Sequence, residues 1–364
     1  TKSNYNIIQN IEKINDKDII INFSSSKEEL LDLLSTVSSS IYYEDSHKKG
    51  EFKSEGKFKL EKWVRNNFMI LTENLNLPAI PPRIQLKFLQ NSATAIFLFS
   101  RNELDLLKLP YHIASHPSLK DGKLNFVKGK SVQYVAINNT DECFDVHFRR
   151  AVNFGIDRKK IIEKVFDSFA EEVYFPFPER YLHKNISRDK YKLYFNLEKA
   201  KNELQRSRCY PYILNRELDF RMRGDDENKA KGLAITQNLR DIGLKVKINP
   251  MEKAPLYKEN GQKKGDLTLL TWYIDFDSAL NFIDPLFSSD SYGNGGNRSF
   301  YKNKAMDEII SKGRINYNLT EDLQIRSLDL LKKDYPWIFL WSIYEIYLVS
   351  PRLSENYQIE DLFF

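Results

Sequence analysis

Hydrophobic residues recur along the chain at two spacings, and the two spacings predict strands that alternate with helices. Residues 218–222 and 244–248 are short apolar runs typical of strands. Between them, apolar residues predict a helix over residues 228–242, with Ala230, Leu233, Ala234 and Leu239 facing inward. Gly243 marks the end of this helix. The order predicts a β-α-β unit, whose parallel strands imply an α/β lobe with helices covering the sheet.

Similar patterns predict elements nearer both ends of the chain. Ile19–Phe23 is typical of a strand, and Ser26 with Glu29 forms a capping box ahead of a helix. The apolar residues of that helix are Leu30, Leu31, Leu33, Leu34 and Val37. Thr320 is placed to cap a later helix, which carries Leu323, Leu328 and Leu331. Residues 337–349 are largely apolar and predict one extended strand.

The segment 148–162 predicts two helices joined at an acidic cap. Asp157 is placed to accept hydrogen bonds from the free backbone amides of the second helix. The buried stripe of that helix would consist of Ile161, Ile162, Val165 and Phe166. By itself, this pattern establishes only a helix pair.

Composition indicates a folded protein with a densely charged surface. The 364 residues are enough for two domains with their own cores, and 41% of them are hydrophobic. No apolar run approaches the roughly 20 residues that span a bilayer, and residues 1–20 are too polar for a secretion signal. The 55 basic residues barely outnumber the 50 acidic ones, so we expect no nucleic-acid partner.

Candidate chemistry is sparse. The two cysteines, Cys143 and Cys209, lack metal-ligand spacing, and we interpret them as buried thiols, with a disulfide as the alternative in an oxidising compartment. His112 and His116 lie at helical spacing, but prolines flank them, which favours loop histidines over a metal pair. Nucleophile elbows, zinc-protease helices and phosphate-binding loops are not found in the sequence. We therefore expect no enzyme, no metal and no cofactor.

Several segments resemble the motifs of one protein family, in that family's order. They are residues 56–60, 137–140, 148–162, 270–276, 281–287, 301–310 and 334–340. Together they resemble the bacterial family 5 extracellular solute-binding proteins, which are the oligopeptide, dipeptide and nickel-binding receptors of ABC importers. The sequence Ile156-Asp157-Arg158 lies at the centre of the resemblance, whereas Phe339 departs from it by replacing a proline.

The resemblance implies a two-lobed type II periplasmic-binding-protein fold of the α/β class. Residues 1–136 and 343–364 would form the first lobe, and residues 137–342 the second. Crossovers near residues 135–139 and 341–344 would form the hinge. Family members open with a strand of the first lobe and a small extra domain. We therefore expect the N-terminal part of the first lobe and most of the extra domain to be missing from this chain.

The resemblance also implies a function. The chain would be a receptor that captures an oligopeptide or other small solute by closing its lobes, and delivers it to an ABC permease in the membrane. It would be periplasmic or on the cell surface, anchored through an upstream lipoprotein signal that is not in this chain. Two alternatives with the same fold stay open: an effector-sensing domain of a regulator, and an interaction module that no longer transports.

One carboxylate carries the expected ligand contact. In the peptide-binding branch of the family, the aspartate that matches Asp275 pairs with the α-ammonium group of the peptide. The alternative for this residue is a carboxylate that caps the loop after its strand. The candidates for apolar walls of the site are Trp272, Tyr273, Trp341 and Tyr134. Aromatic residues at such places also serve as core.

Overall fold

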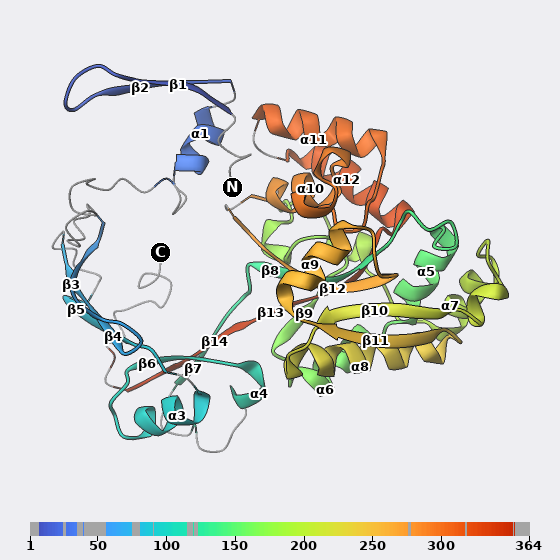
Figure 1. Cartoon of the computed structure of the whole chain (residues 1–364), viewed down its shortest axis with the longest axis horizontal. Helices are drawn as coiled ribbons and strands as arrows, with labels where there is room; N and C mark the ends of the chain where they lie inside the picture. Colours follow the sequence, from blue (N-terminus) through green and yellow to red (C-terminus); the bar gives the residue numbers. More distant parts are fainter. Residues whose placement is uncertain are drawn as a thin grey trace. The chain divides into compact units, whose positions relative to one another are not determined.

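The protein folds into two compact units. The computed structural model describes residues 7–24, 27–34, 39, 56–74, 81–89, 91–114, 119, 123–275, 278–316, 319–351 and 353. The larger unit contains residues 1–33 and 128–344, and the smaller unit contains residues 34–127 and 345–364. A six-stranded sheet lies at the centre of the larger unit (Figure 1).

The six-stranded sheet is mixed, with the strand order β11-β10-β12-β8-β13-β9. Its strands are β8 (Ser131–Ile137), β9 (Ala170–Glu172), β10 (Glu217–Arg223), β11 (Lys245–Met251), β12 (Leu267–Tyr273) and β13 (Trp337–Ile343). Strand β10 is parallel to both β11 and β12, whereas β8 is antiparallel to β12 and β13, and β9 is antiparallel to β13. Strands β8 and β13 are almost wholly buried, and β12 is buried over its first four residues, which explains why their sequences are largely apolar.

The predicted β-α-β unit is confirmed, but the predicted inward face of its helix is wrong in part. Leu239 is buried, whereas Ala230 and Leu233 are exposed. The buried face of the helix consists of Lys231, Gly232, Ile235, Thr236 and Leu239.

Strands β10 and β11 pair in parallel, starting with Glu217 opposite Lys245, and helix α8 (Asp226–Asp241) connects them. Asp225 caps this helix, because its side chain accepts a hydrogen bond from the N–H of Asn228. Gly243 follows the helix with a φ of +98°, a conformation that costs glycine little. The helix stop in the sequence therefore has the expected physical cause.

Helices cover both faces of the sheet (Figure 1). Helices α5 (Val146–Gly155), α6 (Arg158–Val165) and α8 contact one another and cover one face, whereas α9 (Lys253–Gly261) contacts β10 from the other. This unit also contains the helices α7 (Leu197–Gln205), α10 (Leu280–Phe287), α11 (Lys304–Asn316) and α12 (Glu321–Asp334). Thr320 caps α12 as predicted, because its hydroxyl accepts a hydrogen bond from the N–H of Leu323.

The predicted helix pair is confirmed as α5 and α6, and its acidic junction holds a buried arginine. The carboxylate of Asp157 accepts a hydrogen bond from the backbone N–H three residues further on, at 3.0 Å. Arg158 is only 1% exposed, and its guanidinium donates to the carbonyl oxygens of Phe339, Asn153 and Ile156. The start of α6 is therefore tied to the central strand β13.

The cysteines correct the sequence interpretation. Cys143 and Cys209 form a disulfide, with their Cα atoms 5.1 Å apart, rather than two buried thiols. Because 66 positions separate the two residues, their spacing carries no signal of the pairing. The fold brings them together: Cys143 precedes α5, Cys209 follows α7, and these two helices pack against each other.

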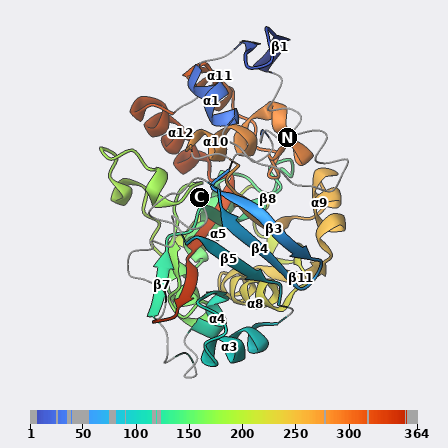
Figure 2. The same cartoon turned by 90° about the vertical axis from the view of Figure 1, so that its left-hand side faces the viewer.

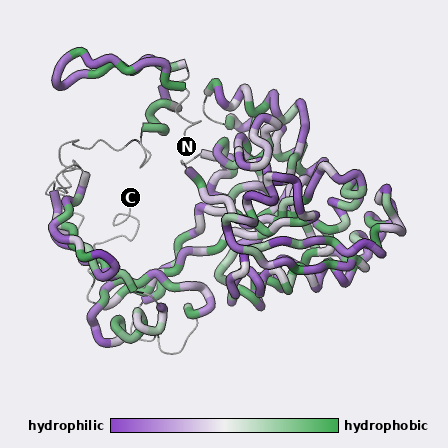
Figure 3. Tube along the Cα trace, in the orientation of Figure 1, coloured by the Kyte–Doolittle hydropathy of each residue, from purple (hydrophilic) through white to green (hydrophobic). Residues whose placement is uncertain are grey.

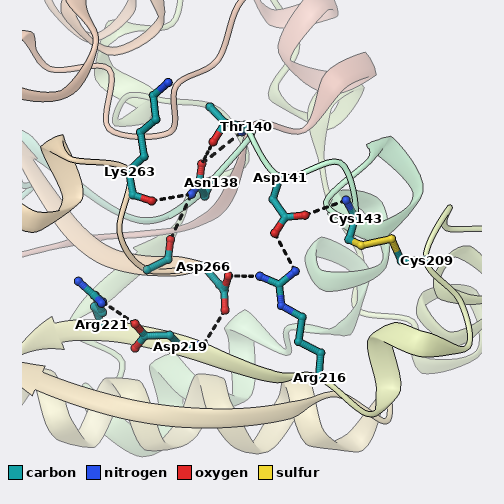
Figure 4. Close-up of polar contacts among 11 residues, drawn as sticks. Asn138, Thr140, Asp141, Cys143, Cys209, Arg216, Asp219, Arg221, Lys263 and Asp266 are labelled. Atoms are coloured by element: carbon teal, nitrogen blue, oxygen red, sulfur yellow. Dashed lines mark hydrogen bonds and ion pairs between the residues drawn. A yellow bond between two sulfur atoms is a disulfide. The ribbon is translucent and has the colours of Figure 1, made fainter.

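A network of charged groups lies on one side of the disulfide (Figure 4). Asp141 accepts hydrogen bonds from the N–H of Cys143 at 2.9 Å and from Arg216 at 2.7 Å. Arg216 also binds the carboxylate of Asp266, which accepts a further hydrogen bond from the N–H of Asp219. Burial raises the pKa of Asp266 above its usual value. The network joins the disulfide to the amino-terminal ends of β10 and β12.

The smaller unit contains two three-stranded antiparallel sheets. One consists of β3 (Phe58–Val64), β4 (Phe68–Glu73) and β5 (Arg83–Lys87), which Figure 2 shows side by side. The other has β14 (Glu345–Val349) between β6 (Leu106–Leu109) and β7 (Lys123–Val127). The described helices of this unit are α3 (Ser92–Ser100) and the short α4 (Tyr111–Ala114).

The apolar segment at residues 337–349 forms two strands rather than the one that the pattern predicts. Strand β13 ends at Ile343 in the larger unit, and β14 begins two residues later in a sheet of the smaller unit. Tyr344 lies between them, and its N–H donates to the carbonyl oxygen of Phe169. An apolar run does not reveal which sheet each residue joins, so the sequence could not show this break.

An antiparallel hairpin forms near the start of the chain from β1 (Ile8–Lys13) and β2 (Ile19–Phe23), and helix α1 (Lys27–Leu34) follows it. Figure 3 shows hydrophobic and hydrophilic residues alternating along the hairpin. The predicted strand and helix are thus confirmed. Of the apolar residues predicted for the helix, Leu30 and Leu33 are buried, Leu31 and Leu34 are exposed, and Val37 lies outside the described residues. Ser26 and the side chain of Glu29 lie outside the described residues.

The boundaries of the compact units differ from the boundaries predicted for the lobes. The unit boundaries fall at 127/128 and 344/345. The predicted first crossover at residues 135–139 therefore lies within and just after β8, inside the larger unit. Residues 1–33 also group with the larger unit, whereas the prediction gave them to the first lobe. The division into two lobes at 136/137 and 342/343 stays a prediction.

Candidate functional site

The candidate site lies at the carboxyl end of strand β12 in the six-stranded sheet, where this strand ends at Tyr273. The start of β8 lies beside the end of β12, because Ser131 pairs opposite Tyr273. The end of β13 lies on the same side of the sheet, because β13 runs antiparallel to β8. In open α/β sheets, ligands bind beyond the carboxyl ends of the parallel strands. Three of the five predicted contact residues, Trp272, Tyr273 and Asp275, come from this end of β12.

Asp275 lies just beyond β12, and its side chain is exposed. Its backbone N–H donates to Oδ1 of Asn281 at 2.9 Å. Asn281 is itself buried in the first turn of α10, so the backbone of Asp275 is held in place. Within the described part of the chain, no donor is bonded to the Asp275 carboxylate, and residues 276 and 277 lie outside that part. A carboxylate in this setting is available to a ligand.

Two aromatic residues, Trp272 and Tyr273, end the strand just before Asp275. Trp272 pairs opposite Val132, and its indole Nε1 is buried with no acceptor among the described residues. Tyr273 is 71% exposed, and as the next residue of the strand it lies on the opposite face of the sheet. The end of β12 therefore combines an exposed ring, an unpaired indole N–H and a carboxylate.

The other two aromatic candidates are core residues in this structure. Tyr134 is buried and stacks on Trp337 with ring centroids 3.5 Å apart, and burial raises the pKa of its phenol. Trp341 is 0% exposed, and its Nε1 donates to Oε1 of Gln133 at 2.7 Å. Gln133 donates in turn to Thr271 at 3.0 Å. Tyr134 and Trp341 thus support the sheet from opposite faces, and their role as walls of a site stays a prediction.

A cluster of charged residues near the end of β13 was not predicted from the sequence. Glu171 of β9 pairs opposite Ser342 of β13, and Lys128 Nζ lies 3.4 Å from its Oε2. Glu179 and Arg188, which are 3.1 Å apart, complete the cluster. These residues come from segments up to 60 positions apart, so only the strand register reveals that they meet.

The histidines do not assemble a site in the part of the chain that the structure describes. His112 lies in α4, edge-on to the ring of Tyr111, whereas His116 is outside the described residues. Among the described residues, no three His, Cys, Asp or Glu side chains are placed to share a metal ion. The described helices also include none that is long and apolar enough to cross a membrane.

Comparison with known proteins gives one family match. The family model described as bacterial extracellular solute-binding proteins, family 5 Middle, matches residues 1–294. The probable D,D-dipeptide-binding periplasmic protein DdpA of Escherichia coli is 24% identical over 262 residues, which are 70% of this chain and 50% of that protein. Heme-binding protein A of Haemophilus influenzae is 27% identical over 285 residues, 75% of this chain and 50% of that protein. The chain thus spans about half the length of these relatives.

Solved structures give the fold. HbpA2 from Haemophilus parasuis matches with a TM-score of 0.79 at 18% identity, covering 95% of this chain and 72% of that one. DppA from Helicobacter pylori, an ABC transporter-associated periplasmic binding protein solved with the peptide STSA, matches with a TM-score of 0.74 at 21% identity. That match covers 96% of this chain and 71% of the other. The predicted fold class, that of periplasmic binding proteins, is confirmed.

Proposed function

We propose, from the premise that this chain belongs to the family 5 bacterial extracellular solute-binding proteins, that it captures peptides and presents them to the permease of an ABC importer. The family consists of solute-binding proteins rather than enzymes. Three of the relatives are named for dipeptides, tripeptides or oligopeptides, and another for heme. A peptide as the solute therefore needs support from the site itself.

The Asp275 carboxylate carries the proposal. It lies at the sheet edge where such folds bind ligands, its backbone is fixed by buried Asn281, and its own oxygens have no donor among the described residues. An ammonium group about 4 Å from a carboxylate gains up to roughly 4 kcal/mol near a protein surface, before the cost of removing water. This chemistry selects the free amino terminus of a peptide. Trp272 and Tyr273 would then line the site from the two faces of the end of β12.

The disulfide supports the proposed location outside the cytoplasm. Disulfides persist in oxidising compartments and are rare where thiols are kept reduced. The pair Cys143–Cys209 therefore fits a periplasmic or cell-surface protein. Anchoring by an upstream lipoprotein signal is part of the same proposal, and it is tested by finding whether the protein in its native cells carries a lipid.

Asp275→Asn is expected to weaken the binding of free-amine peptides by about 2 kcal/mol or more, which is roughly 30-fold in Kd. The substitution preserves the size of the side chain but leaves the peptide ammonium without its partner. Calorimetric titration of wild type and variant with the same peptides measures this difference. Amino-acetylated peptides should bind poorly to both proteins, because they carry no ammonium.

A matched control is Asp241→Asn, which changes an exposed aspartate at the far end of α8 and should leave peptide affinity unchanged. Equal affinity of wild type and Asp275→Asn for a free-amine peptide would refute the role of Asp275. A large fall in the melting temperature of Asp275→Asn would instead favour the loop-capping alternative, since a ligand contact leaves the unliganded fold unchanged.

A second expected result concerns lobe closure, which the proposed mechanism requires. A saturating peptide should lower the radius of gyration measured by small-angle X-ray scattering, because a ligand that contacts both lobes stabilises the closed form. The amino-acetylated peptide serves as the control at the same concentration. Identical scattering curves with and without a peptide that calorimetry shows to be bound would contradict closure.

A further inference from the structure

A second carboxylate, Glu171, lies on the same side of the sheet as Asp275, where β12 and β13 end. It comes from the edge strand β9 and pairs opposite Ser342 of β13. Its side chain is only 9% exposed, and its Oε1 atom is buried without a hydrogen-bond donor anywhere in the part of the chain that the structure describes. Glu171 thus holds an acceptor that no described protein group uses.

The neighbours of Glu171 leave that oxygen unpaired although charges surround it. Lys128 Nζ lies 3.4 Å from Oε2, the other oxygen of the carboxylate, and 4.0 Å from Glu179. Arg188 is committed elsewhere, because it binds Glu179 at 3.1 Å and donates to the carbonyl oxygen of Glu172 at 2.8 Å. Burial and then the negative charge of Glu171 raise the pKa of the Tyr344 phenol.

An unpaired carboxylate oxygen is costly at this depth. A buried acceptor without a donor costs about 1–3 kcal/mol, and more when the group is charged. The cation within reach of the carboxylate, Lys128, is itself half-exposed and lies nearer the other oxygen. A donor brought by a ligand would remove the cost at Oε1, and a positively charged donor would do so most strongly.

The strand register places Glu171 in line with Trp272. Trp272 is opposite Val132, and Trp341 is opposite Gln133. Continuing the antiparallel register of β13 and β8 by one residue places Ser342 level with Val132. Ser342 is in turn opposite Glu171. Trp272 and Glu171 are therefore the two ends of one cross-strand row on one face of the sheet. Both ends carry a buried polar atom with no partner among the described residues.

The length of this row fits an extended peptide. Three strand intervals separate β12 from β9, and at about 4.8 Å each they span roughly 14 Å. An extended chain advances about 3.4 Å per residue, so about four residues cover that distance. A peptide whose amino group is held by Asp275 would thus bring a side chain near Glu171 a few positions further along.

We propose that Glu171 is a specificity subsite that receives the cationic side chain of a bound peptide, the ammonium of lysine or the guanidinium of arginine. This rests on the proposed function as a peptide receptor. The cationic group donates to Oε1, and Lys128 stays with Oε2, so that each carboxylate oxygen has a positively charged partner. A neutral side chain at the same place leaves Oε1 unpaired.

The test uses alanine hexapeptides with a single lysine at each of positions 2 to 6, and the same peptides with norleucine in its place. For at least one position, wild type should bind the lysine peptide about 10-fold more tightly than its norleucine twin. Glu171→Gln should reduce this ratio to within about twofold. The control Glu179→Gln removes a neighbouring carboxylate that is already paired with Arg188, and it should keep the ratio.

Three outcomes overturn the subsite while the proposed function stands. They are equal affinity of wild type for lysine and norleucine peptides at every position, an unchanged ratio in Glu171→Gln, and equal loss of the ratio in both variants. A lower melting temperature of Glu171→Gln with an unchanged ratio shows a structural role only. The affinity ratio decides, because a purely structural role would not change it.

A second measurement separates the subsite from the proposed function. If wild type binds none of the peptides, the peptide proposal fails, and the subsite is tested by titrating protein labelled with carboxyl ¹³C-glutamate with n-butylammonium chloride. The Glu171 signal, assigned by its loss in Glu171→Gln, should move with n-butylammonium and stay fixed with potassium chloride at the same ionic strength. A signal that does not move, as expected when a water molecule alone occupies the site, overturns the subsite.

Discussion

Replacing Arg158 with methionine is expected to lower the free energy of unfolding by about 3–5 kcal/mol. The side chain is 1% exposed, and its guanidinium makes four hydrogen bonds to three residues. They go to the carbonyl oxygens of Phe339, Asn153 and Ile156 and to the side-chain oxygen of Asn153. Methionine fills much of the volume but donates nothing. Each acceptor would then lose a buried donor, although Asn153 Oδ1 would keep the N–H of Phe339 and the Ile156 carbonyl would keep the backbone N–H of residue 158.

The charge of Arg158 persists at neutral pH. Burial lowers the pKa of its guanidinium to about 10, still well above 7, so all of its N–H groups remain available as donors. Because the folded-state pKa is depressed for a base, burial of the charge opposes folding below pH 10. The hydrogen bonds to β13 and to the end of α5 must offset that cost. Losing these hydrogen bonds is therefore expected to lower the free energy of unfolding more than losing the charge does.

Urea unfolding followed by circular dichroism measures the effect of Arg158→Met. The matched control is Lys159→Met, which changes the next residue of α6 at an exposed position and should alter stability by less than about 0.5 kcal/mol. Arg158→Lys should fall between wild type and methionine, because one ammonium cannot reach acceptors on both sides. A loss below about 1 kcal/mol for Arg158→Met would show that water replaces the guanidinium.

The elements that the sequence predicts correctly are those whose signals are local. The β10-α8-β11 unit follows from apolar periodicity and a glycine stop, and the α5-α6 junction follows from the cap at Asp157. Each of these signals lies within a few residues of the structure it determines. The same locality explains the prediction of α12 from Thr320.

What the sequence could not give depends on contacts between distant segments. Trp341 and Tyr273 are both aromatic residues near strand ends, yet one is 0% and the other 71% exposed. Trp341 is paired on both sides, with Gln133 of β8 and Glu172 of β9, whereas Tyr273 is the last residue of β12. The site at Asp275 came from resemblance, whereas Glu171 needed the register of four strands. The disulfide needed the packing of α5 against α7.

Opening that disulfide is expected to lower the free energy of unfolding by about 4 kcal/mol. The bond closes a loop of 66 residues, and the entropy that such a loop removes from the unfolded chain corresponds to roughly that amount. In the folded state Asp141 accepts the N–H of Cys143 and also binds Arg216, so the cross-link adjoins the charged network at the amino ends of β10 and β12. Cutting the link therefore also loosens one anchor of that network.

The measurement compares urea unfolding of wild type, with and without dithiothreitol, with that of the double variant Cys143→Ala, Cys209→Ala. Reduced wild type and the double variant should unfold at similarly low urea concentrations, and dithiothreitol should not move the variant, because it has no bond to reduce. The single variant Cys209→Ala should match the double one, since one thiol cannot close the loop. Equal midpoints for oxidised and reduced wild type would mean that the unfolded chain gains no freedom when the bond opens, and the loop argument would fail.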